Sequence, residues 1–417
     1  MRVALIGPVP PRLGGLTPGG VATHQVQLAD GLASAGVEVS LLATNTAVGD
    51  GCWRPQHTDL PYALYRKIAP RPNSLRQFLR DSGRAIDVLR YLPRVASTHR
   101  HGSRAEVLYN ALTYRRFLVE VQPHVIHVQH PLERCTYARL VRRVEGWRVP
   151  LVVTAHSLFG EHSDATIHNL MAPNLRAAQR VIAVSDHIAD QAIQLGVDAV
   201  RIRVIRSGVD TQRFQPRDRA AARQRLRIAD GACIVLFVGN LEPRKQVDVL
   251  LRACAQARVQ VHTLRLLVVG SGESAGAEDQ TARLVRLSQE LGLGETVQFT
   301  GRLGDSPLLD AYAAADVFAL PSSSEAQGIV ALEAMACGLP VVATAVGGLL
   351  ATIEDGQTGV LVPSGDVDAL ATSLVQMLTD PNRRARIGAA ARQQVEARFA
   401  WSLAIADTID VYREVAR

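Results

Sequence analysis

Two glutamates and one lysine have side chains whose types and spacing could serve catalysis or ligand binding. Glu325 and Glu333 are separated by seven residues in the segment SSSEAQGIVALEAMACG (322–338). A carboxylate accepts hydrogen bonds well from two neighbouring hydroxyls, such as those of a sugar. Gly328 lies between them, and glycine lets backbone N–H groups approach a phosphate closely. Lys245 is one of only two lysines in this chain, and its compact ammonium group could neutralise a departing diphosphate.

The sequence around these residues predicts the elements that position them. Two short apolar runs, each bounded by Pro or Gly, read as buried parallel strands, and a segment of helix composition lies between them. Ligands in open α/β sheets bind at the carboxyl ends of strands, where a helix N-terminus favours phosphate. Glu325 falls at such an end. The alternative interpretation makes Glu325 a solvated loop charge and Glu333 the wet face of an amphipathic helix. The predicted strands are Asp316–Leu320 and Leu339–Thr344, and the predicted helix is Gly328–Ala336.

Length and composition limit the class of protein. A chain of 417 residues is too long for one ordinary core, so we expect two domains. Apolar content of 47% and charged content of 20% indicate a globular protein rather than a disordered one. The five scattered cysteines include no CxxC pair, which favours a reducing compartment and argues against a structural zinc. The apolar start is too short for a signal peptide.

The amino-terminal half predicts a mononucleotide-binding unit followed by further strands. RVALIG, a Gly-rich loop, a helix and a second strand alternate as in such units, and Gly19 and Gly20 open the helix. His156 follows the run LVVT at another predicted carboxyl end. A lone histidine is usually structural, but this position favours a functional role. The predicted strands are Arg2–Gly7, Val37–Ala43, His124–Gln129, Leu151–Thr154 and Val181–Val184.

The carboxyl-terminal half restarts the same alternation. Gly270 follows the strand LRLLVV in GSGESAG, whose glycine spacing misses the GxGxxG fingerprint by one residue, so a nicotinamide oxidoreductase is weakly supported. Asp366 and Asp368 form a DxD before a helix, which N-capping explains more simply than metal binding. We therefore expect no metal. The predicted strands are Ala232–Val238, Leu264–Val269 and Val297–Thr300.

A basic stretch between Arg66 and Arg104 carries much of the net charge of +7. Within it, Asn73–Val95 places apolar residues and arginines at helical spacing on different faces. Such a helix can lie on an anionic membrane surface, although a solvated face is the commoner explanation. Charge alone does not choose among nucleic acid, lipid and phosphorylated ligands.

Taken together, these motifs resemble the retaining glycosyltransferases of family 4. That resemblance implies the α/β GT-B fold, with two Rossmann-like doubly wound domains facing each other across a cleft. It places an acceptor domain at 1–206, a nucleotide-sugar domain at 207–395, and a closing helix at 396–417 that packs back on the first domain. Phe399, Trp401 and Tyr412 would lie in that helix, with Trp401 and Tyr412 as core rather than site residues.

The resemblance also implies roles for individual residues. Glu325 and His156 would contact the donor sugar and Lys245 the leaving diphosphate, which makes these three the expected catalytic residues. Glu333 would hold the ribose hydroxyls. The other expected donor-binding residues are Gly19, Gly20, Asn240, Arg244, Gly270, Arg302, Leu303, Gly328, Ile329 and Val330.

Five positions depart from the family pattern. Asn240 and Gln246 replace an Arg and a Gly of the phosphate-binding motif, and Ser207 replaces a common Asn before Gly208. Leu350 and Ala351 replace a common Pro-Glu pair. Asn240 cannot neutralise charge, so Arg244 would help or catalysis would depend more on Lys245.

The implied function is transfer of a sugar, with retention, from a nucleotide-diphosphate donor to an acceptor hydroxyl in glycan, glycolipid or polysaccharide synthesis. The partners would be the nucleotide sugar and a glycan, lipid or small-molecule acceptor, without nucleic acid. No metal or other cofactor is expected. The location would be cytoplasmic, with the Arg66–Arg104 stretch as a possible contact to the inner membrane face. A silent nucleotide-binding homologue, a nicotinamide oxidoreductase and a nucleic-acid or membrane-binding module are the alternatives.

Overall fold

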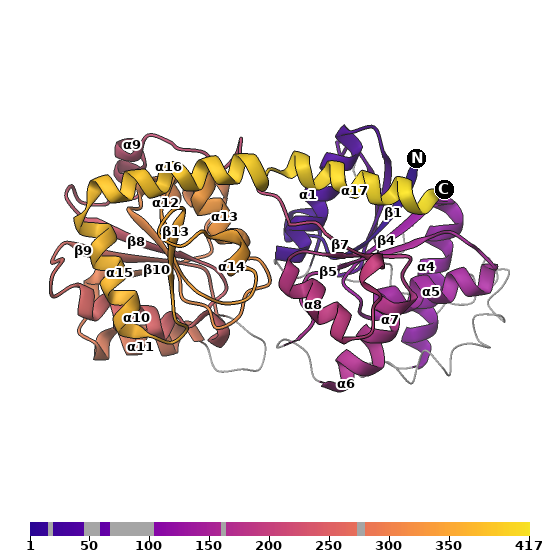
Figure 1. The fold of residues 1–417 in the computed structure, drawn as a ribbon, viewed down its shortest axis with the longest axis horizontal. Coiled ribbons are helices and arrows are strands. Elements are labelled where there is room, and N and C mark those ends of the chain that lie inside the picture. The colour runs from indigo at the N-terminus through magenta and orange to yellow at the C-terminus, as the bar shows by residue number, and fades with distance from the viewer. Residues whose placement is uncertain (16–19, 46–58, 67–103, 160–163, 273–279) are drawn as a thin grey trace. The chain divides into compact units, whose positions relative to one another are not determined.

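The computed structural model describes residues 1–15, 20–45, 59–66, 104–159, 164–272 and 280–417. These residues form two compact units (Figure 1). The first unit contains Met1–Arg206 and Trp401–Arg417, and the second contains Ser207–Ala400. The predicted helix Asn73–Val95, most of the basic stretch, and Gly19 lie outside the described residues.

The first unit is built on a parallel sheet of seven strands in the order β3-β2-β1-β4-β5-β6-β7. The central strands carry apolar side chains that are buried on both faces of the sheet, as is usual for parallel sheets. The chain leaves β1 in one direction and β4 in the other, so the strand order reverses between these two neighbours. The strands are β1 Arg2–Gly7, β2 Glu38–Ala43, β3 Ala63–Arg66, β4 Val125–Gln129, β5 Leu151–Ala155, β6 Arg180–Ala183 and β7 Ile202–Val204.

Helices cover both faces of this sheet (Figure 1). The amino-terminal helix α1 packs on β1 and β2 together with α17, the last helix of the chain, while α4 and α5 pack on β1 and β4. The α-helices are α1 Gly20–Ser34, α4 Arg104–Val121, α5 Glu133–Glu145, α6 Asp164–Thr166, α7 Ala172–Ala177, α8 Asp186–Gln194 and α17 Trp401–Ala416; the short η elements are η1 Pro11–Leu13, η2 Ile167–Met171 (a π-helix) and η3 Ala199–Arg201.

The second unit repeats the design with six parallel strands in the order β10-β9-β8-β11-β12-β13. The order reverses between β8 and β11, which pair through Val317 with Val235 and Phe318 with Leu236. The strands are β8 Cys233–Val238, β9 Leu264–Val269, β10 Val297–Gly301, β11 Val317–Leu320, β12 Val341–Thr344 and β13 Gly359–Val362.

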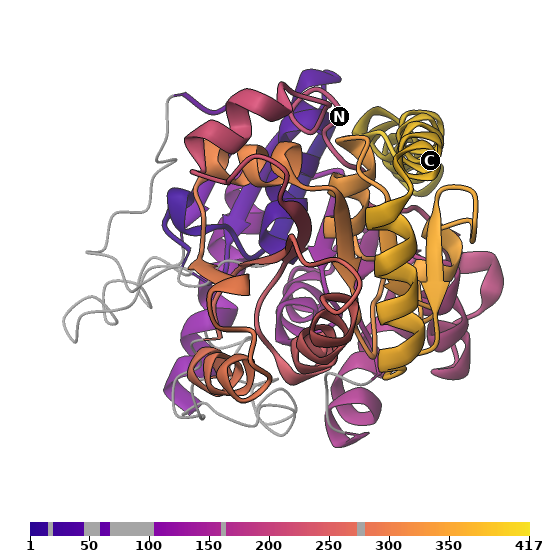
Figure 2. The ribbon, with the colours of Figure 1, turned by 90° about the vertical axis from the view of Figure 1, so that its left-hand side faces the viewer.

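Helices also lie on both sides of the second sheet (Figure 2). Helices α10 and α15 pack against each other over one face, and α12 and α13 pack on β8, β11 and β12. The α-helices are α9 Arg219–Arg225, α10 Val247–Ala257, α11 Gln280–Glu290, α12 Asp305–Ala314, α13 Ile329–Ala336, α14 Leu349–Thr352, α15 Val367–Thr379 and α16 Pro381–Arg398; the short η elements are η4 Pro243–Lys245 and η5 Gly294–Thr296.

The predicted strands agree with the observed ones to within two residues, and the structure adds three short strands, β3 and β7 in the first unit and β13 in the second. One assignment of a residue to a helix was wrong. Phe399, expected in the closing helix, lies between α16 and α17 in the core of the second unit and is 1% exposed. Its backbone carbonyl accepts a hydrogen bond of 2.8 Å from Val209 N–H. The helical pattern alone did not show this break after Arg398. No helix within the described ranges is long and apolar enough to span a membrane.

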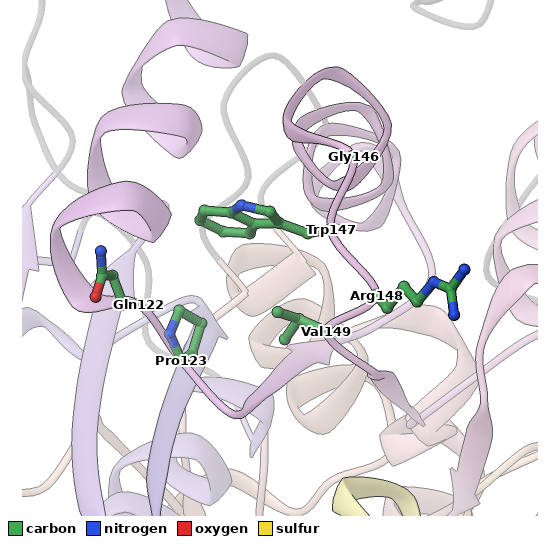
Figure 3. A pocket seen from close by; sticks show the side chains of 6 residues that line it. All are labelled: Gln122, Pro123, Gly146, Trp147, Arg148 and Val149. Carbon is green, nitrogen blue, oxygen red and sulfur yellow. The ribbon is translucent and has the colours of Figure 1, made fainter.

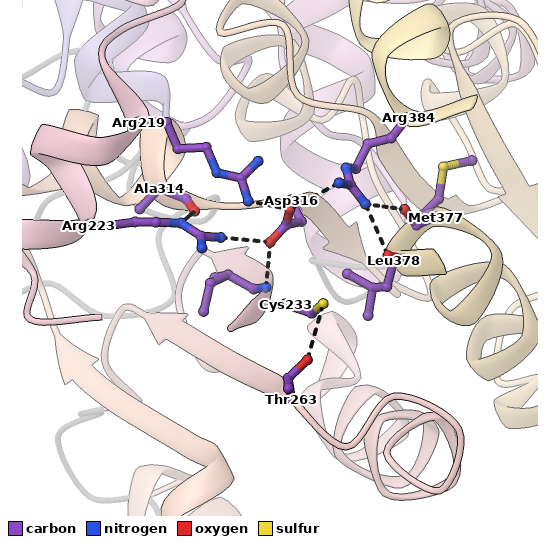
Figure 4. Close-up of polar contacts among 10 residues, drawn as sticks. Arg219, Arg223, Cys233, Thr263, Ala314, Asp316, Met377, Leu378 and Arg384 are labelled. Carbon is purple, nitrogen blue, oxygen red and sulfur yellow. Dashed lines mark hydrogen bonds and ion pairs between the residues drawn. The ribbon is translucent and has the colours of Figure 1, made fainter. Parts of the chain in front are cut away.

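A buried carboxylate, Asp316, fixes the start of β11 in the second unit (Figure 4). It is 3% exposed and accepts hydrogen bonds from Arg219 and from Arg223, the latter at 2.9 Å. Arg384 lies 3.6 Å away, and the backbone N–H of Ile234 donates to the same carboxylate at 2.8 Å. Asp316 therefore ties α9, α16 and β8 to β11.

We expect Asp316→Asn to lower the free energy of unfolding of the second unit by about 3 kcal/mol, because the arginines would lose their buried counter-charge. Urea unfolding of the full chain measures this change. Asp305→Asn is the matched control, since Asp305 pairs with Arg213 while its side chain is 80% exposed. The control should change stability by less than about 0.5 kcal/mol. Equal effects of the two substitutions would contradict this role for Asp316.

Candidate functional site

The reversal of strand order in the second unit places two loops side by side. In open parallel sheets, ligands bind at the carboxyl ends of the strands that flank such a reversal. Here the loop after β8 leads into η4, which ends at Lys245, and the loop after β11 contains Glu325. The two residues are 80 positions apart in sequence and meet only because β8 and β11 are neighbours.

Lys245 and Glu325 form a buried ion pair. Each residue is 8% exposed, and the ammonium group of Lys245 donates to Oε1 of Glu325. Ser322 Oγ donates to the same oxygen at 2.9 Å. Burying two charges costs desolvation free energy that their attraction only partly returns. Such a pair contributes little to stability, so a role in ligand binding is the better explanation for its presence at this edge.

Backbone contacts hold the Glu325 loop in place from both sides. Ser323 N–H donates to the carbonyl of Arg244 at 2.8 Å, and Gly348 N–H donates to the carbonyl of Glu325 at 2.9 Å. Gly347 has φ +49°, and a Cβ there would lie 2.1 Å from that same carbonyl oxygen. Only glycine fits this close approach.

Helix α13 begins at a glycine in the left-handed region. Gly328 has φ +81°, and an added Cβ would lie 2.5 Å from Leu349 Cδ2. The N–H groups of Ile329 and Val330 are in the first turn of α13, where helical N–H groups have no partner within the helix. These donors and the positive end of the helix dipole make the helix start suited to an anion.

Glu333, in the second turn of α13, contacts the phenol of Tyr312 rather than Lys245. Tyr312 Oη donates to Glu333 Oε2 at 2.7 Å. Burial raises the pKa of Glu333 from 4.5 to about 7, although the hydrogen bond from Tyr312 and the charge of Arg213 act in the opposite direction. No sequence motif pointed to Tyr312, because it lies on a different helix, α12.

The other predicted donor-binding residues lie at the carboxyl ends of β8, β9 and β10. Glu242 holds both Asn240, whose Nδ2 donates at 3.2 Å, and Arg244, whose Nε donates at 2.8 Å. Gly270 has φ +140°, and a Cβ there would lie 1.8 Å from the carbonyl oxygen of Gly239. The predicted residues of this second unit are thus gathered along one edge of its sheet.

Three further contacts complete that edge. Arg302 Nε donates to Ser271 Oγ at 2.8 Å, and the half-buried Leu303 packs against the core of the second unit. Gln327, which the sequence did not single out, bonds Ser207 twice, through its amide nitrogen and its oxygen, at 2.7 Å each. Gln246 has φ +48°, a conformation that glycine adopts at lower cost.

In the first unit, His156 follows β5 within a cluster of buried imidazoles. Its Nε2 lies 2.8 Å from Gln129 Oε1, and its ring lies edge-on to His24 with centroids 4.7 Å apart. Burial and the neighbouring histidines keep the pKa of His156 well below its ordinary value, so the ring is neutral at pH 7. The predicted Gly20 is the first residue of α1 and is exposed.

The DxD motif has the capping role expected from sequence. Asp366 is the N-cap of α15 and accepts from Ala369 N–H at 2.9 Å, while Asp368 accepts from Gln256 at 2.9 Å. Among the residues that the structure describes, no group of three or more His, Cys, Asp or Glu side chains is placed to hold a metal ion.

A surface pocket of about 350 Å³ lies at the amino-terminal ends of the strands of the first sheet, opposite to the edge where His156 lies (Figure 3). Its walls come from the segments that precede β4 and β5, with the ring of Trp147 above Pro123 and Val149. None of the predicted site residues lines it. The lining residues are Gln122, Pro123, Gly146, Trp147, Arg148 and Val149.

Two doubly wound parallel units, the second with a helix start suited to an anion, define a class of two-unit α/β proteins. Two family models match the chain: residues 18–213 match Glycosyltransferase Family 4, and residues 218–394 match Glycosyl transferases group 1. A D-inositol 3-phosphate glycosyltransferase from Rhodococcus erythropolis is 33% identical over 417 residues, covering 95% of this chain and 87% of that protein. The chain therefore belongs to glycosyltransferase family 4.

Two other comparisons agree with the predicted family and with the predicted pair of Rossmann-like α/β domains, which are thus confirmed. D-inositol 3-phosphate glycosyltransferase 2 from Catenulispora acidiphila is 38% identical over 283 residues, covering 64% of this chain and 66% of that protein. With several curated relatives, the matched part spans about two thirds of the relative's length. The solved structure of sucrose-phosphate synthase from Thermosynechococcus elongatus has a TM-score of 0.79 at 26% identity, covering 99% of this chain and 98% of that one.

The raised pKa of Glu333 predicts a pH-dependent stability. Because the folded state binds this proton more tightly than the unfolded state, the stabilisation is complete below about pH 4.5 and is lost as the pH rises through about 7. Glu333→Gln cannot ionise and can still accept the Tyr312 hydrogen bond. It should make the second unit more stable than the wild type at pH 8, by on the order of 2 kcal/mol, and flatten the slope between pH 5 and 7 in urea unfolding.

Glu290→Gln is the control for this substitution, because Glu290 is an exposed glutamate of α11. It should leave the slope unchanged. A wild-type slope that survives Glu333→Gln would show that another group causes it.

Proposed function

We propose that this protein transfers a sugar from a nucleoside-diphosphate sugar to an acceptor hydroxyl, with retention at the anomeric carbon and without a metal. The buried pair of Lys245 and Glu325, at the strand reversal of a family 4 chain, carries the proposal. A cation that is half of a buried pair can exchange its carboxylate partner for the diphosphate of the donor. The freed carboxylate of Glu325 can then accept hydrogen bonds from sugar hydroxyls.

Stabilisation of the leaving diphosphate would supply most of the catalysis. Charge develops on the phosphate oxygen as the bond to the sugar breaks, and fixed donors in a dry site stabilise that charge strongly. We assign this role to Lys245 and to the N–H groups of Ile329 and Val330, with Gly328 allowing close approach. Arg244 is the second cation at the edge, since Asn240 has no charge. These groups could perform the transfer without a metal ion.

Glu333 is the proposed ribose-binding residue. Its carboxylate is half-buried on α13, one turn beyond the helix start proposed for the diphosphate. Two vicinal hydroxyls would donate to it, while Tyr312 keeps one of its oxygens oriented. In the first unit, we propose that the ring of His156 forms a hydrogen bond with a hydroxyl of the sugar.

The relatives suggest the class of acceptor. Three of them are named D-inositol 3-phosphate glycosyltransferases, at 33% to 38% identity, so we propose a phosphorylated polyol or sugar as the acceptor. Transfer to D-inositol 3-phosphate and to unphosphorylated inositol can be compared directly. A clear preference for the phosphorylated compound would support this assignment, and equal rates would contradict it. The cytoplasmic location remains a prediction, as does contact of residues 66–104 with a membrane.

We expect Lys245→Met to lower the turnover number for sugar transfer by about 10²–10³-fold, because one fixed donor to the leaving phosphate is lost. Release of nucleoside diphosphate in the presence of acceptor measures it, and circular dichroism checks the fold. Arg252→Met removes an exposed cation of the adjacent helix α10 and should leave turnover within about twofold. Similar losses in both variants would refute the assignment of Lys245.

The stereochemical outcome can be tested separately. With an α-linked nucleoside-diphosphate sugar as donor, the proposed retention predicts an α-linked product, recorded early in the reaction by ¹H NMR of the anomeric proton. A β-linked product would require an inverting mechanism and would exclude the proposed one.

A further inference from the structure

A chain of buried side chains connects the last helix of the protein to His156. Tyr412 Oη of α17 lies 2.6 Å from His127 Nδ1, and His127 Nε2 lies 2.7 Å from Thr154 Oγ1. Gln129 lies between the two histidines, with its Nε2 3.4 Å from His127 Nε2 and its Oε1 2.8 Å from His156 Nε2. All five residues are at most 8% exposed, so water does not easily replace any of these partners.

The donor and acceptor chemistry of the chain fixes where each proton lies. The carbonyl oxygen of Gln129 can only accept, so the proton of the neutral His156 ring must be on Nε2. The amide nitrogen of Gln129 can only donate, so Nε2 of His127 is unprotonated and also accepts from the Thr154 hydroxyl. The proton of a neutral His127 is then on Nδ1 and is donated to Tyr412 Oη.

Both rings are neutral at physiological pH. Burial lowers the pKa of His127 to about 3, and burial together with His24, His130 and His127 lowers that of His156. The groups that face His156 are these imidazoles, with the ring of His130 stacked 6.4 Å away and that of His24 at 4.7 Å. A neutral imidazole has one donor and one acceptor nitrogen, so choosing the tautomer decides which kind of hydrogen bond the free nitrogen can make.

We propose that Gln129 and Tyr412 are positioning residues that hold His156 as its Nε2–H tautomer, leaving Nδ1 as a hydrogen-bond acceptor. The consequence for catalysis rests on the proposed function: His156 would accept a hydrogen bond from a hydroxyl of the substrate and would not donate one. Tyr412 lies 285 residues from His127 in sequence, so the carboxyl-terminal helix would set the chemistry of a site histidine that follows β5.

The tautomers are coupled because the chain of hydrogen bonds has a direction. Turning the Gln129 amide by half a turn would reverse the bond to each histidine and move the proton of each ring to its other nitrogen. The Tyr412 hydroxyl accepts from Nδ1–H of His127 in the observed direction, and it could donate to an unprotonated Nδ1 in the reversed direction. In Tyr412→Phe the observed direction would leave a buried N–H donor without a partner, which costs more than the unpaired acceptor nitrogen of the reversed direction. His127 would then carry its proton on Nε2, and His156 on Nδ1.

The first experiment reads the tautomer directly, without substrate. The full chain is labelled with ¹⁵N-histidine, and the ring nitrogen shifts and long-range couplings of His156 are assigned by their loss in His156→Asn. We expect Nε2–H in the wild type and a shift of the population toward Nδ1–H in Tyr412→Phe. Tyr137→Phe is the matched control, since it removes another buried tyrosine hydroxyl, one that accepts from Asn110 at 3.3 Å. Nδ1–H in the wild type, or equal spectra for Tyr412→Phe and the wild type, would overturn the proposal.

The second experiment tests Gln129. In Gln129→Glu a carboxylate accepts the hydrogen bond from Nε2–H of His156 and stabilises the charged imidazole. The pKa of His156 should therefore rise by at least one unit in an NMR titration. Gln179→Glu is the control, because Gln179 Oε1 accepts a backbone bond of 2.7 Å from Leu151 at the other end of β5. It should leave the titration of His156 unchanged. An unchanged titration in Gln129→Glu would overturn the role of Gln129.

Activity then separates this inference from the proposed function. If the tautomer and the titration respond as expected while His156→Asn retains full sugar transfer, the positioning role stands and the catalytic role of His156 fails. If His156→Asn abolishes transfer while Tyr412→Phe and Gln129→Glu leave the ring unchanged, the catalytic role of His156 stands and the positioning role of Gln129 and Tyr412 fails.

Discussion

The attraction between Lys245 and Glu325 depends on one constraint, the pairing of β8 with β11 where the strand order of the second sheet reverses. The chain continues from β8 toward one side of the sheet and from β11 toward the other. The loops that follow these two neighbouring strands therefore lie next to each other at the carboxyl-terminal edge, with no helix between them. The pair is buried, so its charges interact in a medium of low polarity. The proposed diphosphate site, sugar site and helix start are all arranged around this contact.

Close packing of backbone at that edge explains the glycines around it. Gly270 passes next to the carbonyl of Gly239, and Gly347 passes next to the carbonyl of Glu325. A methyl group at either position would push two strand ends apart. The resulting edge presents N–H groups and one ammonium group rather than side-chain bulk, which suits a ligand that carries phosphate.

The two units differ in the electrostatics of their proposed site residues. In the second unit these are a charged pair and a helix start, whereas in the first unit they are neutral imidazoles and carboxamides held by hydrogen bonds. Burial keeps His24, His127 and His156 uncharged, so the first unit would recognise hydroxyls without competing for the phosphates. The pocket beside Trp147 lies at the amino edge of the same sheet and takes no part in this division.

The sequence by itself determined the alternation of strands and helices and the family, and it pointed to Lys245, Glu325 and Glu333 as candidate site residues, because apolar periodicity and short motifs are local properties. The tertiary structure alone decided which distant groups meet. It joined Lys245 to Glu325, gave Glu333 a raised pKa through burial beside Tyr312, and placed Tyr412 on His127. It also buried Phe399 in the core of the second unit and placed Glu242 where it accepts hydrogen bonds from both Asn240 and Arg244. Burial and hydrogen-bond partners depend on the register of separate elements, which no local pattern encodes.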